Sequence, residues 1–116
     1  MLTTNIKDYK AGWMMGNFTP SVLRTEHFEL AHHKYKQGFK GDNHRHDYAT
    51  EYNYVVSGSV NVNGKVFSGG DMFIFTPGEY CGSVQYLEDT DLMIIKSPSV
   101  IGDKVDVRNQ SMPMPK

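Results

Sequence analysis

The sequence contains little cysteine and no excess of charge of either sign. Cys81 is the single cysteine among 116 residues, so we expect a fold without internal disulfides and a reducing, cytoplasmic setting. Twelve lysines and arginines stand against thirteen aspartates and glutamates, which leaves a formal net charge of −1. Because no basic excess exists to neutralise phosphates, neither nucleic acid nor an anionic membrane surface is an expected partner.

Long apolar runs and helical periodicity are also absent. The longest apolar runs, such as residues 72–75, have four residues, whereas a membrane-spanning helix needs about 20. The N-terminal residues lack the basic and apolar regions of a secretory signal. No window repeats apolar residues at the spacing of a helix face beside a capping residue. We therefore expect a single domain with little helix.

The chain has instead a series of short runs rich in Val, Ile, Tyr, Phe and Thr, separated by Gly, Pro, Asn and Asp. Such runs at regular spacing predict the strands of an all-β sandwich or barrel. The predicted strands are residues 13–18, 21–24, 27–36, 44–46, 51–57, 59–62, 65–67, 71–75, 83–87 and 91–96. Asn63-Gly64 tolerates positive φ at both turn positions, so it predicts a type I′ hairpin.

The pattern divides the chain into three segments. Residues 1–26 form an N-terminal lead-in with short strands, residues 27–104 form the barrel core, and residues 105–116 form a polar tail punctuated by proline.

Two histidines and a glutamate in the core predict a metal site. Residues i and i+2 of a strand share a face, so His44 and His46 project side by side. Glu51 follows five residues later, where a neighbouring strand brings its carboxylate to the same point. Two histidines and one carboxylate on one side of a metal, with open positions opposite, are typical of non-haem iron(II). Zinc, manganese, nickel and copper also suit these donors, so the expected cofactor is a divalent metal of open identity.

The spacing around these residues resembles the first motif of the cupin superfamily. Gly38 is followed after five residues by His44-Arg45-His46, after four more by Glu51, and after six more by Gly58. The resemblance implies a single-domain double-stranded β-helix, the jelly-roll barrel of cupins, with a metal at its mouth. Most of the chain is also similar to small stand-alone cupins, a group that brings no defined reaction with it. That resemblance implies a homodimer, and we expect the N-terminal strand to contribute to its interface.

The second cupin motif is matched only in its first half. Gly70-Asp71 and Pro77-Gly78 agree with it, but Cys81 stands in place of its histidine and Gln85 in place of its asparagine. In cupins with the full set, three histidines and one glutamate hold the metal. Cys81 is then either a fourth, thiolate ligand that favours zinc, or a small buried residue that leaves a coordination position open.

Strand alternation sorts the residues around this site. If Glu51 points inward, Asn53 and Val55 share its face, and Tyr52 and Tyr54 lie on the opposite one.

Other titratable residues are weaker candidates. At most one of His32 and His33 faces the barrel. These two and His27 are surface or pocket-lining residues, and we favour the surface. Glu79, near the Pro77-Gly78 turn, is a candidate acid or base, against the simpler interpretation of an exposed turn residue.

Three functions remain open at this stage. The first is a metal-dependent isomerase, lyase or dioxygenase acting on a small polar molecule, a carbohydrate derivative or an organic acid. The second is a module that binds a small ligand without turnover. The third is a structural cupin whose metal only stabilises the barrel.

Overall fold

The computed structural model describes residues 1–106, which form twelve strands and two single turns of 3-10 helix. The helical turns are η1 (Ile6–Asp8) and η2 (Lys10–Gly12). The strands are β1 (Trp13–Gly16), β2 (Leu23–Arg24), β3 (Glu29–Tyr35), β4 (His44–His46), β5 (Thr50–Ser57), β6 (Ser59–Val62), β7 (Lys65–Ser68), β8 (Met72–Phe75), β9 (Tyr80–Cys81), β10 (Val84–Tyr86), β11 (Thr90–Ser97) and β12 (Lys104–Asp106). The predicted tail lies outside the described residues, apart from its first two positions in β12. None of the described helices is long or apolar enough to cross a membrane.

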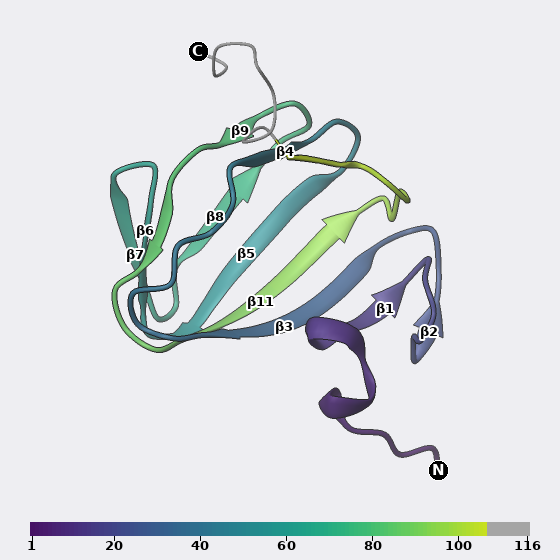
Figure 1. Ribbon diagram of the computed structural model, residues 1–116. Helices are drawn as coiled ribbons and strands as arrows, with labels where there is room; N and C mark the ends of the chain where they lie inside the picture. The colour runs from purple at the N-terminus through teal and green to yellow at the C-terminus, as the bar shows by residue number, and fades with distance from the viewer. Residues whose placement is uncertain (107–116) are drawn as a thin grey trace.

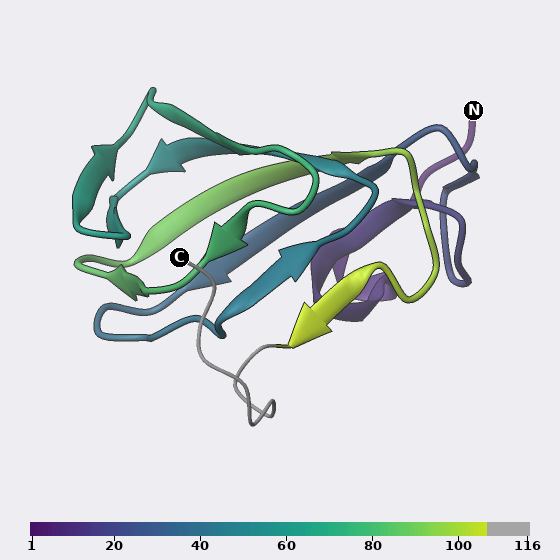
Figure 2. The same ribbon diagram turned by 90° about the horizontal axis from the view of Figure 1, so that it is seen from above.

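The strands form one large sheet and two small ones, which together make a jelly-roll barrel. The large sheet has the order β2-β1-β3-β11-β5-β8, and its long strands β3, β11 and β5 lie side by side in Figure 1. The small sheets have the orders β10-β6-β7 and β12-β4-β9. Seen from above in Figure 2, β12 lies beside β4, so the strand that carries both histidines is flanked on each side. The all-β, double-stranded β-helix expectation is confirmed.

The inner face of the large sheet supplies the core, as the alternation of β5 illustrates. Glu51, Asn53 and Val55 are buried, whereas Tyr52 and Tyr54 are exposed, which confirms the predicted sorting. The buried apolar cluster comprises Ala31, Val55, Val60, Val62, Phe75, Cys81, Tyr86, Leu92 and Ile94. Glu51 is thus a charged residue on an otherwise core-forming face, a position that a carboxylate occupies only with partners.

Two turns show why glycine is required where it stands. The hairpin between β6 and β7 has φ of 52° at Asn63 and 89° at Gly64, the two positive values of the predicted type I′ turn. Gly58, which closes the first motif, has φ of 93°, and a Cβ there would collide with the Asp89 carbonyl and with Thr90. A side chain at position 58 is therefore excluded both by conformation and by space.

The sequence did not predict β9 and β12. Strands of two and three residues are too short to display alternation, and nothing in their composition separates them from loops. They matter because β9 pairs with β4 in the register His44↔Cys81, and β12 pairs with it in the register Lys104↔His46.

Candidate metal centre

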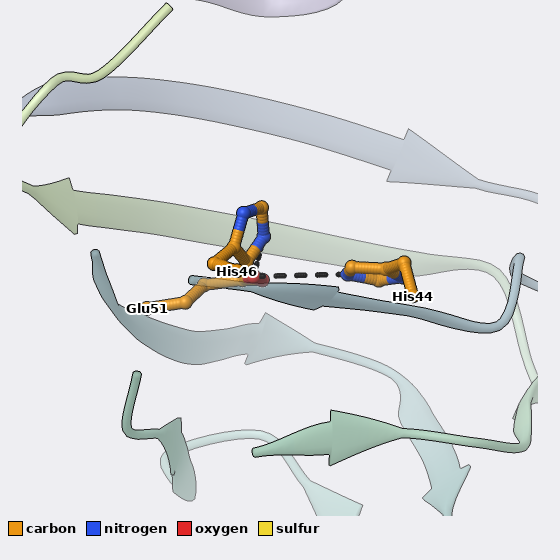
Figure 3. A group of neighbouring side chains, drawn as sticks. All are labelled: His44, His46 and Glu51. Atoms are coloured by element: carbon orange, nitrogen blue, oxygen red, sulfur yellow. Dashed lines mark ion pairs between the residues drawn. The ribbon is translucent and has the colours of Figure 1, made fainter. Parts of the chain in front are cut away.

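The three predicted ligands meet at one point. The Nε2 atom of His46 lies 2.9 Å from Oε2 of Glu51, and the Nε2 atom of His44 lies 3.9 Å from the same oxygen. One ligand atom from each residue lies within 4.8 Å of the others. Figure 3 shows both imidazole rings turned toward the carboxylate. Strands β4 and β5 are consecutive in the chain, and the turn between them brings Glu51 beside the histidine pair.

These residues fit a divalent metal ion. Two ligands at about 2.1 Å from a metal and at right angles to each other are about 3 Å apart. The 2.9 Å separation of His46 from Glu51 already fits, and the 3.9 Å separation of His44 from Glu51 must contract by about 1 Å. The Nδ1 atom of His44 lies 2.8 Å from the Asp42 carbonyl oxygen, which assigns the proton to Nδ1 and leaves Nε2 as the ligand atom. Such an outer hydrogen bond fixes both the tautomer and the ring orientation of a metal-binding histidine.

The electrostatics of the triad favour an ionised carboxylate. Burial alone raises the pKa of Glu51, but the neighbouring imidazoles of His44 and His46 outweigh it and hold that pKa well below its usual range. Glu51 is therefore charged and ready to bind a cation at neutral pH.

Asp103 supports the site from the far end of the chain. Its buried carboxylate accepts backbone N–H bonds from Asp47, Tyr48 and Ala49 at 2.9, 2.9 and 3.0 Å. The same carboxylate lies 3.8 Å from Nδ1 of His46, beyond hydrogen-bond distance, and this buried Nδ1 has no hydrogen-bond partner in the described part of the chain. Asp103 therefore fixes the turn between β4 and β5, and with it the spacing of the ligands.

A cavity of about 230 Å³ opens beside the triad. His44, His46 and Glu51 all line it, so they present their ligand atoms to space that a small molecule can occupy. The other lining residues are Trp13, His33, Tyr35, Phe39, Gly41, Asp42, Asn53, Phe73, Phe75, Cys81, Val84, Tyr86, Leu92, Ile94, Lys96 and Lys104.

Cys81 lies in this cavity but outside the ligand group. It is buried and faces His44 across the β4–β9 ladder, yet its sulfur does not belong to the cluster formed by the three predicted ligands. Burial raises the pKa of its thiol to about 12, so the sulfur is protonated in the metal-free protein. Cys81 as a fourth ligand stays a prediction.

The remaining sequence candidates are placed differently. Glu79 is exposed and accepts hydrogen bonds from the backbone N–H and hydroxyl of Thr76, and it does not line the cavity. Its role as an acid or base stays a prediction. Arg45, which lies between the two histidines and was not a candidate, pairs with Asp47 at 3.0 Å.

His33 takes the pocket-lining position that the sequence left as the less favoured alternative. The surface position favoured for it is wrong: its ring lines the cavity, and its Nδ1 atom lies 2.7 Å from the Tyr35 hydroxyl. His32 points to the other face, 3.7 Å from Asp91. Burial lowers the pKa of His33, although Glu51 opposes the shift. Ala31 is the fully buried residue of β3, and His33 is two residues further along the same strand. Strand alternation from Ala31 therefore places the His33 side chain on the inner face.

Comparison with solved structures supports the same fold. The chain is similar to KdgF from a Halomonas species, with 26% identity, a TM-score of 0.60, and coverage of 66% of this chain and 74% of that one. It is also similar to DMSP lyase DddQ from Ruegeria pomeroyi, with 11% identity, a TM-score of 0.70, and coverage of 86% and 52%. A third match is the bacterial pirin YhhW from Escherichia coli in complex with nickel(II), with 17% identity, a TM-score of 0.63, and coverage of 77% and 39%.

No protein-family model matches the chain, and no curated protein matches its sequence. The barrel, the first motif and the structural neighbours together support a small cupin.

Proposed function

We propose that this cupin is a metal-dependent enzyme that acts on a small organic acid, with isomerase, lyase or dioxygenase chemistry at His44, His46 and Glu51. The observation that carries the proposal is that all three ligands line one cavity of about 230 Å³. The coordination positions that they leave open therefore face space that a substrate can enter. A divalent metal there supplies Lewis acidity, or activation of dioxygen when the metal is iron.

The chain also offers a group for proton transfer. His33 lies in the cavity with a lowered pKa, so its imidazole is neutral near pH 7 and able to accept a proton. Its hydrogen bond to the Tyr35 hydroxyl fixes the orientation of the ring. We favour His33 over Glu79 for this role, because the carboxylate of Glu79 is held by Thr76 outside the cavity.

The metal site is tested by elemental analysis of protein purified without a metal-affinity tag. Wild-type protein should carry nearly one equivalent of metal, and the His44→Ala/His46→Ala variant should carry none. The matched control is His27→Ala/His32→Ala, which removes two histidines that do not line the cavity. Equal metal in the two double variants, or none in wild type after reconstitution, would refute the proposal.

Two further measurements separate the enzyme from its alternatives. Manganese(II)-loaded protein should strongly enhance water-proton relaxation, because exchangeable water reaches open coordination positions. Absence of enhancement, restored by Cys81→Ser, would instead support a closed structural site. Incubation with a panel of organic acids, followed by mass spectrometry, distinguishes turnover from the saturable, unproductive binding expected of a non-catalytic module.

We also propose a homodimer that forms through the outer face of the large sheet. Six neighbouring side chains there are 37–52% exposed: Tyr52, Tyr54, Val56, Met72, Ile74 and Ile95. Together they expose roughly 500 Å² of mostly apolar surface, which is at the upper end for monomers and more than half of a standard interface on one partner. The N-terminal strand is a weaker interface candidate, because the Trp13 ring faces the cavity.

Light scattering coupled to size-exclusion chromatography tests this assembly. Ile74→Lys should convert the dimer to a monomer, since it places a charge in the centre of the apolar face. Val66→Lys, at a similarly exposed position on β7, is the matched control and should remain dimeric. A monomeric wild-type protein at micromolar concentration would contradict the proposal.

A further inference from the structure

Asn53 is a polar residue in an apolar part of the inner face of the large sheet. It lies on β5, two residues beyond Glu51, and is only 2% exposed. Strand β5 runs between β11 and β8 (Figure 1), and the residues opposite Asn53 there are Ile94 and Phe73. Val55 follows on the same face. None of these three side chains can hydrogen-bond to the Asn53 amide, and a buried amide without partners is costly.

The amide of Asn53 is only partly satisfied. Its Nδ2 atom donates to the Phe73 carbonyl oxygen at 3.4 Å, which is longer than the usual range of about 2.7–3.2 Å. This bond also assigns the two amide atoms, because only the NH₂ group can donate to a carbonyl. Within residues 1–106, the Oδ1 atom accepts no hydrogen bond.

The unpaired oxygen of Asn53 opens onto the cavity. Three side-chain nitrogens in the described part of the chain are both sealed from solvent and unpaired, and they belong to His32, His33 and His46. The Oδ1 atom of Asn53 is not among them, so it is accessible. Because Asn53 lines the cavity beside the metal ligands, the accessible side is the cavity.

Stability does not explain an asparagine at this position. A leucine, which has a similar shape, would bury no unpaired acceptor among Ile94, Phe73 and Val55. Proteins retain such locally unfavourable residues chiefly at functional sites, where stability is lost in exchange for activity. An acceptor in the wall of a ligand cavity confers specificity, since a site built to pair with a substrate hydroxyl rejects the analogue that lacks it.

Asn53 lies close enough to the metal ligands for one small molecule to reach both. Residues i and i+2 of a strand are about 6.7 Å apart on one face, and Glu51 is itself one of the ligands. A carboxylate and a hydroxyl separated by one methylene group, with a hydrogen bond of about 2.8 Å at the hydroxyl, span such a distance.

We propose that Asn53 determines specificity by accepting a hydrogen bond from a hydroxyl group of the substrate, and that the substrate is a small 3-hydroxy acid. Its carboxylate lies at the open positions beside His44, His46 and Glu51, and its hydroxyl lies at Oδ1 of Asn53. This inference rests on the proposed function, which leaves the class of organic acid open.

The first test needs no ligand and uses urea unfolding of the full chain at equal zinc content. Asn53→Leu should leave the midpoint unchanged or raise it, because an unpaired buried acceptor is removed. The matched control is Thr90→Val: Thr90 is also 2% exposed, but its hydroxyl accepts from the Ser59 N–H and donates to the Glu88 carbonyl. Thr90→Val should lower the midpoint. Equal losses in the two variants would show that Asn53 is structural and would overturn the proposal.

The second test measures specificity by isothermal titration calorimetry on the zinc-loaded full chain. The probes are the two enantiomers of 3-hydroxybutyrate, and butyrate, which lacks only the hydroxyl. Wild type should bind one enantiomer at least about tenfold more tightly than butyrate. Asn53→Leu should lose this preference while binding butyrate at least as tightly as wild type does. Thr90→Val, which changes no residue of the cavity wall, should keep the preference.

Zinc content is determined in each sample, which separates this inference from the proposed function. Bound zinc with no preference in wild type, or with the preference retained in Asn53→Leu, would overturn the role of Asn53 and leave the metal site standing. Absence of zinc from wild type after reconstitution would overturn the proposed function and the substrate class together.

Discussion

Replacing Asp103 should loosen the metal site without touching a metal ligand. Three backbone N–H groups of residues 47–49 donate to its carboxylate at 2.9–3.0 Å. Hydrogen bonds to charged groups are each worth about 1.5–3 kcal/mol, and water will replace part of that when the carboxylate is removed. We therefore expect Asp103→Ala to lower the free energy of unfolding by about 3–5 kcal/mol, a large share of the 5–15 kcal/mol typical of a domain.

Asp103→Asn gives a graded version of the same perturbation. The asparagine oxygen can still accept from Asp47 and Tyr48, but its amide NH₂ then faces the N–H of Ala49, donor against donor. One lost bond and one unpaired buried donor predict a cost of about 2 kcal/mol. Zinc affinity should fall about tenfold, as for other groups that position metal ligands from outside the coordination sphere.

Urea unfolding of the metal-free variants and zinc competition with a chelator measure the two effects separately. The matched control is Asp89→Asn, since Asp89 also accepts a backbone N–H, from Gln37 at 2.9 Å, but is exposed and distant from the site. If Asp103→Asn behaved like Asp89→Asn in both measurements, the turn would not depend on this carboxylate and the reasoning would be refuted.

Three other perturbations have defined outcomes. Gly58→Ala should destabilise the protein by about 2–4 kcal/mol in urea unfolding. Gly38 has a similar φ of 89° but open space around it, so Gly38→Ala should cost only about 1–2 kcal/mol. Equal losses in the two variants would show that the collision at position 58 is absent. Because burial lowers the pKa of His33, the unfolded chain binds its proton more readily below pH 6.5, so wild type should lose stability relative to His33→Gln as the pH falls from 7.5 to 5.5. That loss should be at most about 1.4 kcal/mol per pH unit, and a constant difference between the two proteins across the range would contradict it. Saturating zinc at 100 times its dissociation constant should stabilise the protein by about 2.7 kcal/mol in thermal unfolding, a gain that chelator removes and that His44→Ala should not show.

The parts of the site that sequence reasoning predicted are those encoded locally. His44 and His46 are two apart on β4, and Glu51 follows five residues later at the start of β5, so the short connection between the two strands keeps all three near one another. The inward set on β5 followed from simple alternation for the same reason. Recognition of the barrel depended on the motif rather than on propensity, because short strands at regular spacing suit several β architectures.

The parts that escaped prediction are contacts between distant segments. Asp103 lies more than fifty residues from the turn that it binds, and no local pattern announces such a pairing. The pairing of Lys96 with Glu29 and with Glu51 depends on the register of β11 against β3 and β5, which a single sequence does not specify. Strand β12 is too short to be detected, although it carries Lys104 to the cavity.

The pairing of β12 with β4 has a consequence for the order of folding. Strand β4 has only three residues, and its neighbours β9 and β12 come from the later part of the chain. During synthesis from the N-terminus, the histidine pair is made early but lacks both flanking strands and the Asp103 carboxylate until nearly the whole described chain has been translated. A metal ion at this site would therefore meet its final geometry only at the end of folding, and a chain truncated before residue 103 would keep His44, His46 and Glu51 while losing the frame that aligns them.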